Sequence, residues 1–269
     1  MTHSSKGTAL ITGASTGIGA IYAERLVRRG YDLILVARNA QRLNDLAGRL
    51  TSATGRAVKV IAADLNDKAG LSAVEKTLRD DDSISMLVNN AGIGSVASVL
   101  QDNVDEMEAM ISLNITALTR LTYAIAPRFV ARGTGTIVNI SSAVAIAVEN
   151  LNGVYSASKS YVLSFGHALQ RDLANKGVRI QTVLPAATAT EFWDVAGYAP
   201  QKTSQSTMSA ENLVDAALAG LDMGELVTIP SLHDNNEWLD WEKARRAISS
   251  SFSNAKPAPR YALTANINV

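Results

Sequence analysis

Short runs of apolar residues alternate along the chain with segments in which apolar residues recur every three or four positions. The runs are mostly apolar and predict buried strands at 8–12, 31–37, 57–62, 85–89, 135–140 and 178–184. The helically spaced segments predict helices at 18–29, 39–54, 69–79, 104–130 and 155–175, the fourth with a bend near its centre. Strands without a polar face that alternate with helices are typical of a parallel sheet covered on both sides. The pattern therefore predicts an α/β fold with a doubly wound parallel sheet.

The pattern loosens after residue 184. Residues 185–206 are rich in Ala, Thr, Ser and Gln, and Phe192, Trp193 and Tyr198 stand among them. A connection of this length in a compact domain is commonly a functional lid. The remaining periodic segments predict a helix at 210–221, a strand at 226–229 and a helix at 237–248, and no clear period follows. We therefore expect one domain over 1–269, with a lid at about 186–208 and a C-terminal arm at about 249–269.

Composition and charge remove several classes of function. The 269 residues carry a net charge of zero, so a nucleic acid or an anionic membrane surface is not an expected partner. The chain has no cysteine, and its three histidines, His3, His167 and His233, are far apart, so we expect no metal site. Residues 1–7 are polar without an apolar signal region, and no apolar run reaches the ~20 residues of a membrane span. We expect a cytoplasmic protein.

A glycine-rich loop connects the first predicted strand to the first predicted helix. Gly13, Gly17 and Gly19 give the spacing T-G-x-x-x-G-x-G, which differs from the G-x-G-x-x-G fingerprint of many dinucleotide-binding proteins. Small residues allow a tight turn there and let a phosphate approach the N–H groups at the helix N-terminus. A glycine-rich turn without a ligand is the alternative interpretation.

Arg38 stands at the end of the second predicted strand. In dinucleotide-binding folds an acidic residue at this place binds the ribose 2′-hydroxyl, whereas an arginine accommodates a 2′-phosphate. Asp32 lies at the other end of the strand, so no carboxylate competes there. The residue type favours NADP(H) as the cofactor, with NAD a possible substitute; a surface arginine that opens the next helix is the plain alternative.

Tyr155 and Lys159 are four residues apart in a predicted helix. This spacing places both side chains on one helix face, with Cβ atoms about 5–6 Å apart. A phenol beside an ammonium group is suited to proton transfer, because the positive charge stabilises the phenolate. The same spacing also occurs by chance on solvated helix faces, so the pair needs support from the rest of the chain.

That support comes from four motifs in one order: Thr12–Gly19, Asn89-Asn90-Ala91-Gly92, Ser141-Ser142 and Tyr155–Lys159. With them, the chain resembles the short-chain dehydrogenase/reductase family from about Thr8 to Thr190. The resemblance implies a Rossmann-type fold and an oxidoreductase that transfers a hydride between NAD(P) and a carbonyl or secondary alcohol. It also implies a homo-oligomer, a tetramer or a dimer, built through the helices that begin near Val104 and Leu151.

The resemblance assigns roles to matching positions. The catalytic set it implies is Asn114, Ser142, Tyr155 and Lys159. The cofactor-binding set it implies is Gly13, Ser15, Thr16, Gly17, Ile18, Gly19, Arg38, Asp64, Leu65, Asn90, Ala91, Gly92, Tyr155, Lys159, Pro185, Thr188 and Thr190. One position departs from the family, because Ala186 stands where members usually have glycine after the sixth strand, which affects the expected carboxamide contacts.

Tyr155 is then the acid that protonates the oxygen of a carbonyl during reduction, and its phenolate is the base in oxidation. To act as a base at neutral pH, Tyr155 needs its pKa lowered by ~3 units, which requires roughly 4 kcal/mol of preferential stabilisation of the phenolate. We expect Lys159 and the positive charge of oxidised nicotinamide to supply it. Ser142 is expected to hydrogen-bond the same substrate oxygen, and Asn114 to hold a water in a proton relay.

The expected substrate is a small hydrophobic ketone, aldehyde or secondary alcohol. Residues 143–153 are mostly aliphatic, with Val144, Ile146, Val148 and Leu151, and the lid adds aromatic side chains. Polar residues on these loops, such as Glu149, Asn150 and Glu191, are more often solvated. A 3-oxoacyl thioester reductase remains the alternative within the enzyme class. A non-catalytic dinucleotide-binding sensor is the alternative outside it.

Overall fold

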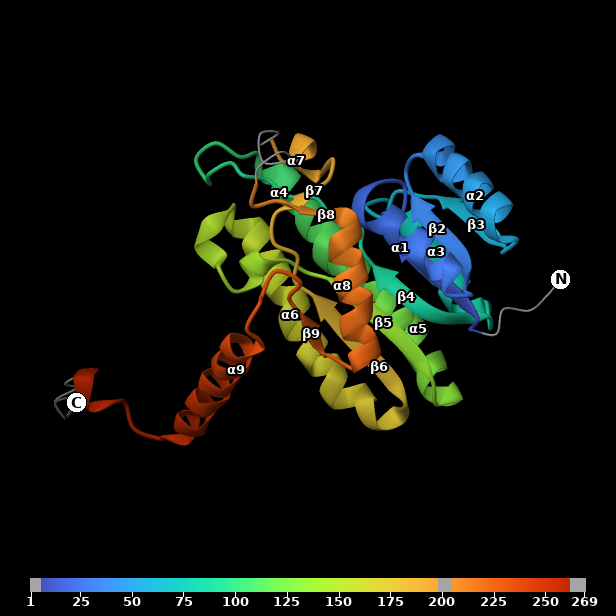
Figure 1. Cartoon of the computed structure of the whole chain (residues 1–269). Coiled ribbons are helices and arrows are strands. Elements are labelled where there is room, and N and C mark those ends of the chain that lie inside the picture. Colours follow the sequence, from blue (N-terminus) through green and yellow to red (C-terminus); the bar gives the residue numbers. More distant parts are fainter. Residues whose placement is uncertain (1–5, 198–204, 262–269) are drawn as a thin grey trace. The chain divides into compact units, whose positions relative to one another are not determined.

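The structure, a computed structural model, describes residues 6–197 and 205–261. Within them, seven strands pair in parallel in the order β3-β2-β1-β4-β5-β6-β9 (Figure 1). Their bounds are β1 Thr8–Thr12, β2 Asp32–Ala37, β3 Val58–Ala62, β4 Ile84–Asn89, β5 Gly135–Ile140, β6 Val178–Val183 and β9 Val227–Thr228. The order of the strands reverses between β1 and β4, and ligands of such sheets bind beyond the carboxyl ends at this point. The predicted doubly wound α/β fold is confirmed.

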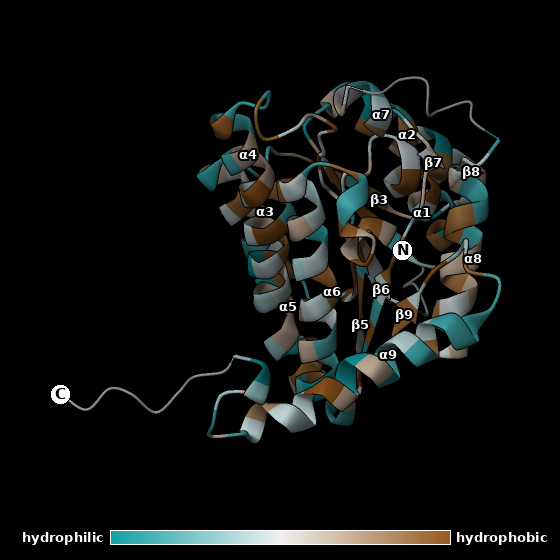
Figure 2. Ribbon diagram, turned by 90° about the vertical axis from the view of Figure 1, so that its left-hand side faces the viewer, coloured by the Kyte–Doolittle hydropathy of each residue, from teal (hydrophilic) through white to brown (hydrophobic). Residues whose placement is uncertain are grey.

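Helices cover both faces of this sheet. Their bounds are α1 Gly17–Arg28, α2 Ala40–Thr54, α3 Lys68–Asp80, α4 Val104–Ile111, α5 Leu118–Arg132, α6 Gly153–Leu173 and α8 Ala210–Met223. One core joins the sheet to α1, α2 and α8, and the other joins it to α3, α5 and α6. Figure 2 shows β5 and β6 between these layers, with α5 and α6 on one side and α8 on the other. The predicted bounds of these elements agree with the structure within two residues.

The long helix predicted at 104–130 is continuous from Val104 to Arg132. Its centre is a π-helical segment, Ser112–Ala117, which lies where the sequence predicts a bend. Among the described residues, only this helix is long and apolar enough to cross a membrane by length and composition. The α5 half buries Leu121, Ile125 and Phe129 in a core against the sheet, which accounts for its apolar character.

The lid contains short elements that the sequence pattern does not predict. Strand β7, Thr188–Ala189, pairs in parallel with β8, Met208–Ser209, and helix α7 spans Phe192–Val195. Elements of two to four residues are too short to produce a recognisable hydrophobic period, which is why they are missed. Tyr198 and the neighbouring residues up to 204 lie outside the described part of the chain.

The chain divides into two compact units, Met1–Ser231 and Leu232–Val269. The second contains α9, Asn235–Ser249, which the sequence predicts at 237–248, and the 3-10 segments Ser250–Ser253 and Pro259–Tyr261. The arm expected from residue 249 onward thus has local helical structure up to 261, and residues 262–269 are outside the described part. The organisation as one domain stays a prediction.

Candidate active site

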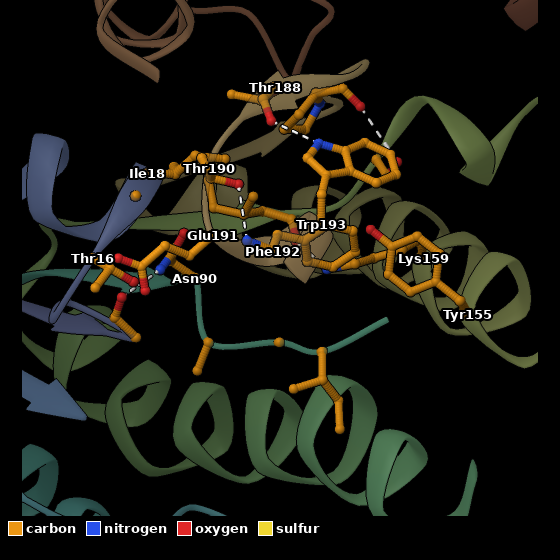
Figure 3. A pocket seen from close by; sticks show the side chains of 18 of the residues that line it. Thr16, Ile18, Asn90, Tyr155, Lys159, Thr188, Thr190, Glu191, Phe192 and Trp193 are labelled. Carbon is orange, nitrogen blue, oxygen red and sulfur yellow. Dashed lines mark hydrogen bonds between the residues drawn. The ribbon is translucent and has the colours of Figure 1, made fainter. Parts of the chain in front are cut away.

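A cleft of about 1030 Å³ lies beyond the carboxyl ends of the central strands. All of the predicted site residues line it except Gly19, Asp64, Leu65 and Asn114. Figure 3 shows its two ends, with Thr16 and Ile18 of the glycine loop on one side and Tyr155 with the lid aromatics on the other. The tertiary structure therefore brings segments together that are more than a hundred residues apart in the sequence.

The four exceptions lie behind or beside the cleft. Leu65 is 6% exposed and packs in the core between the sheet and α3, while the Asp64 carboxylate accepts a hydrogen bond from the N–H of Asn66 at 2.9 Å. Their expected contacts with adenine stay predictions. Gly19 and Asn114 support the walls of the cleft from behind, as described below.

The glycine loop forms a cradle that side chains would fill. Gly13 and Gly17 adopt φ values of +63° and +53°, and a Cβ on Gly19 would lie 2.3 Å from the Gly13 carbonyl oxygen. Thr16 precedes α1 without a side-chain cap, and the first turn of α1 carries no acidic residue. The N–H groups of this turn are therefore available to an anion. These features fit the phosphates of a dinucleotide.

Asn90 and Thr12 hold this loop against the end of β4. The Asn90 amide donates to the carbonyl oxygens of Thr12 at 2.9 Å and Gly13 at 3.1 Å. In return, the Thr12 hydroxyl oxygen accepts from the N–H groups of Asn90 and Ala91, both at 3.0 Å. Because the loop and the end of β4 are cross-linked in both directions, the cradle is preorganised for its ligand.

The rim of the cleft carries more charge than the sequence suggests. Arg38 is exposed there after β2, where a 2′-phosphate would be recognised. A carboxylate also lies at this rim, in contrast to the expectation, because the lid brings Glu191 to Arg42 of α2 in an ion pair of 2.8 Å. Arg42 and Glu191 are 149 residues apart, so no local pattern reports their contact.

Tyr155 and Lys159 lie on α6 at the other end of the cleft, and each is only 6% exposed. The Lys159 ammonium donates to the carbonyl oxygen of Ile140 at 3.0 Å and lies 5.8 Å from the centroid of the Tyr155 ring. Ser142 follows β5, and its hydroxyl donates to the carbonyl oxygen of Pro185 at 3.3 Å. The structure thus brings Ser142, Tyr155 and Lys159 into one site, as expected.

Burial shifts the pKa values of both Tyr155 and Lys159. Burial raises the pKa of Tyr155 to about 12, and a hydrogen bond with Ser142 opposes this rise. Burial also lowers the pKa of Lys159 to about 8. In the protein alone, the loss of hydration around the phenol determines the direction of the shift. The fall of the Tyr155 pKa expected with oxidised nicotinamide bound stays a prediction. The phenol is protonated at neutral pH and is equipped to donate a proton.

Asn114 lies in the π-helical segment and is 2% exposed. Its side-chain oxygen accepts from the N–H of Ile93 at 3.0 Å, and its amide donates to the Ile93 carbonyl oxygen at 2.9 Å and to Ser158 Oγ at 3.0 Å. These bonds fix the loop between β4 and α4, which lines the cleft. A Cβ on Gly92 in this loop would lie only 3.4 Å from Lys159 Nζ and 3.1 Å from Asn114 Oδ1. The role of Asn114 in a proton relay stays a prediction.

An aromatic wall stands beside Tyr155. The Phe192 ring lies 5.5 Å from the Tyr155 ring and 5.3 Å from the Trp193 ring, between centroids (Figure 3). Trp193 is fixed by its indole N–H, which donates to the Thr188 carbonyl oxygen at 2.8 Å. The lid therefore contributes aromatic side chains to the cleft, as the sequence suggests.

The aliphatic segment before α6 contributes only in part. Val144 and Leu151 line the cleft, as does Asn150. Ile146, Val148 and Glu149 are not among the lining residues, and Val148 is 43% exposed. The substrate region is thus lined by aliphatic and aromatic side chains.

Sequence reasoning missed a polar cluster that holds the N-terminus of α6. Asn152 caps this helix and hydrogen-bonds to Asp102 in the loop before α4. Asn152 has a recognisable local signal, because asparagine is favoured immediately before a helix. Asp102 has none, since the contact depends on how the loop folds.

A sequence profile of the short chain dehydrogenase family matches residues 7–198. The chain belongs to the short-chain dehydrogenase family. It is accordingly an oxidoreductase, and the predicted family, fold and enzyme class are confirmed.

Two solved structures are similar over nearly the whole chain. One is a short-chain dehydrogenase from Sphingobium yanoikuyae in complex with NADPH, with 49% identity over 95% of this chain and 100% of that one, and a TM-score of 0.92. The other is a bulky-bulky ketone specific alcohol dehydrogenase from Comamonas testosteroni, with 44% identity over 95% and 98% of the two chains and a TM-score of 0.88.

A curated relative, very-long-chain 3-oxoacyl-CoA reductase-A from Danio rerio, is 37% identical over 188 residues. The match covers 68% of this chain and 59% of that relative's length. The chain thus spans little more than half the length of that relative, which is a longer protein in the same family.

Proposed function

We propose that this short-chain dehydrogenase reduces hydrophobic ketones with NADPH and catalyses the reverse oxidation of the corresponding secondary alcohols. The observation that carries the proposal is the placement of the Tyr155 phenol, which is buried beside Ser142 and Lys159 in a cleft that begins at the glycine loop. Such a group is an acid placed where a carbonyl oxygen would gain its proton.

The cofactor is NADP(H), with NAD(H) as a weaker substitute. The N–H groups at the start of α1 suit the phosphates, and Arg38 suits the 2′-phosphate that distinguishes NADPH from NADH. The related Sphingobium enzyme was solved with NADPH, which supports the same choice here. When bound, the nicotinamide supplies the hydride in reduction and accepts it in oxidation.

The residues at the other end manage the proton. Tyr155 donates its phenolic proton to the oxygen of the reduced carbonyl, and Ser142 donates a hydrogen bond to the same oxygen as charge develops on it. The phenolate left behind is stabilised by the Lys159 ammonium, which Ile140 holds beside the Tyr155 ring. Asn114 fixes the adjoining loop and, as the family resemblance implies, assists the return of the proton.

The substrate is a ketone with hydrophobic groups on both sides of the carbonyl. Val144, Leu151, Phe192 and Trp193 give the cleft an apolar lining near Tyr155. The similarity to a Comamonas enzyme described as specific for bulky-bulky ketones supports this choice. A 3-oxoacyl thioester is the second candidate, favoured by the similarity to the Danio rerio reductase.

The test follows NADPH oxidation with dialkyl and diaryl ketones, methyl ketones and an acetoacetyl thioester. We expect turnover of the bulky ketones by the wild type and its loss in Tyr155→Phe. Tyr261→Phe is the matched control, because Tyr261 is 57% exposed in the 3-10 segment Pro259–Tyr261 and does not line the cleft. Equal turnover by wild type and Tyr155→Phe would refute the proposal. Turnover of the thioester alone would favour the second candidate, and tight NADPH binding without any turnover would favour a sensor.

We propose further that the protein is a cytoplasmic homo-oligomer, a tetramer or a dimer, without a membrane or nucleic-acid partner. Exposed apolar side chains along the helix from Val104 to Arg132, with Val104, Ile111 and Tyr123 at 77%, 43% and 68% exposure, support a protein contact there. Light scattering after size exclusion tests the assembly, and fractionation of the native cell tests the location.

A further inference from the structure

Asn152 uses every hydrogen-bonding position of its side chain. It is 6% exposed, and its side-chain oxygen accepts from the N–H groups of Val154 at 2.8 Å and Tyr155 at 3.1 Å. Its amide nitrogen donates to the carbonyl oxygen of Ala97 at 2.8 Å and to the Asp102 carboxylate at 2.5 Å. An asparagine side chain has two acceptor sites and two donor sites, so none is left over.

Asp102 belongs to the loop of residues 94–103, which also reaches the lid. The Ser95 hydroxyl donates to the Asp102 carboxylate at 2.9 Å and accepts from the N–H of Ala97 at 3.0 Å. The N–H of Val96, which lines the cleft, donates to the carbonyl oxygen of Ala196 at 3.3 Å. One polar network thus connects the substrate side of the cleft to the first turn of α6.

Tyr155 is the third residue of α6 and lies within that first turn. The first N–H groups of a helix have no partner inside the helix, so the turn is ordered only as well as its cap. Asn152 supplies this cap directly to the backbone of Tyr155. A misplaced catalytic group costs much of its rate, because proton transfer requires hydrogen-bond geometry.

Asp102 and the Ala97 carbonyl oxygen together fix which way the Asn152 amide faces. A carboxylate only accepts hydrogen bonds, so it selects the orientation in which the amide nitrogen points toward the loop and the oxygen points toward the N–H groups of α6. The negative charge of Asp102 near the start of α6 also interacts favourably with the positive end of the helix dipole. Without Asp102, the amide nitrogen keeps only the Ala97 carbonyl oxygen as a partner, and the cap is held less firmly.

We propose that Asp102 and Asn152 form a positioning pair that holds the Tyr155 phenol in its catalytic place and ties it to the substrate-side loop. The inference rests on the proposed ketone reductase function and adds residues outside the catalytic set. Neither residue touches the substrate in this scheme. Both act through the backbone of Tyr155.

The variants separate the capping of α6 by Asn152 from the hydrogen bond between Asn152 and Asp102. Asn152→Asp keeps an oxygen for the N–H groups of α6 but loses the donor to Asp102 and adds a like charge. Asp102→Ala removes the acceptor, whereas Asp102→Asn keeps an acceptor oxygen at the same place. Asp105→Ala is the matched control, because Asp105 is an exposed acidic residue at the start of α4.

We expect Asn152→Asp and Asp102→Ala to lower kcat for ketone reduction about 10- to 100-fold, the scale of a small displacement of a catalytic group. Asp102→Asn should retain most activity, and so should Asp105→Ala. The Kd of NADPH should stay unchanged in all of them, because the phosphate cradle is at the other end of the cleft. In alcohol oxidation, the pH at which kcat rises should move upward in Asp102→Ala, since a displaced phenolate loses stabilisation from Lys159.

The combination of Asp102→Asn with Asn152→Asp exchanges donor and acceptor, because the new amide at 102 can donate to the new carboxylate at 152. It should recover part of the activity that Asn152→Asp alone loses, because the Ala97 carbonyl oxygen still lacks its donor. If it recovers none, or if Asp102→Ala matches Asp105→Ala in kcat and pH profile, the inference is overturned while Tyr155-dependent activity of the wild type leaves the proposed function intact. A lower Tm with unchanged kcat well below that temperature would equally overturn it, because the pair would then be structural only.

Discussion

The absence of a side chain at Gly94 leaves room for the Phe192 ring beside Tyr155. A Cβ at this position would lie 2.4 Å from Cζ of Phe192, 2.9 Å from its Cε2 and 3.1 Å from Cδ2 of Tyr155. The φ of Gly94 is outside the left-handed region, so alanine can adopt the backbone there. Gly94→Ala therefore tests the packing of the aromatic wall without imposing backbone strain.

The size of the effect follows from these distances. Carbon atoms in contact are about 3.5–4.0 Å apart, so the Phe192 ring must retreat by roughly 1–1.5 Å. Its contact with the Tyr155 ring, 5.5 Å between centroids, is then lost or weakened. An aromatic pair contributes about 0.5–1.5 kcal/mol, which corresponds to about a 2- to 12-fold change in an equilibrium or a rate.

We expect Gly94→Ala to lower kcat/KM for a bulky ketone by about that 2- to 12-fold factor, while the KM for NADPH is unchanged. Steady-state kinetics of NADPH oxidation measures both constants. Gly48→Ala is the matched control, because a Cβ on Gly48, within α2, would meet nothing within 4 Å. It should leave both constants as in the wild type.

The decisive comparison uses Phe192→Ala as a second background. If the Cβ acts by displacing the Phe192 ring, Gly94→Ala should change kcat/KM little once that ring is absent. A loss from Gly94→Ala that is as large in the Phe192→Ala background as in the wild type would refute the reasoning. It would mean that the methyl group acts on Tyr155 or on the backbone instead.

Three further predictions concern the cofactor, the pH profile and the core. Arg38→Ala should reduce the preference for NADPH over NADH by about 10- to 100-fold, the scale of a lost charge-assisted hydrogen bond, and the ratio of the two kcat/KM values measures it; a wild type that prefers NADH would contradict this interpretation of Arg38. Ketone reduction should decline as the pH rises through about 8. Lys159, with its pKa lowered to about 8, loses its charge there, while Tyr155, with its pKa raised to about 12, keeps its proton. A kcat/KM profile that is flat well above that pH would show that Lys159 stays charged or is not needed. Asn89→Ala should lower the free energy of unfolding, measured with denaturant, by about 2–4 kcal/mol, because the buried Asn89 amide donates to Thr122 Oγ1 at 3.0 Å and Asn139 Oδ1 at 2.9 Å. Replacing both Asn89 and Asn139 by Leu should cost less than the sum of the two single replacements by Leu. Strict additivity would contradict the coupling between the two residues.

The sequence alone determined the strands, the helices and their order. Each depends on residues within about ten positions of one another, such as the short, mostly apolar run Thr8–Thr12 and the asparagine Asn39 that caps α2. The glycine loop, Arg38 and the Tyr155–Lys159 pair were also visible, because each is a local motif with its own chemistry. Since the alternation of strands and helices restricts the topology strongly, these local signals were enough to predict the fold and the family.

Tertiary structure alone decided how these parts meet. Arg42 pairs with Glu191 across 149 residues, and the amide of Asn152 bonds to Asp102 across 50. Neither contact leaves a period or a motif, because each depends on how a lid or a loop folds over the sheet. The pKa of Tyr155 is the same kind of property. Lys159 and a bound oxidised nicotinamide are expected to lower it, whereas burial, which only the folded chain determines, raises it to about 12 in the protein alone.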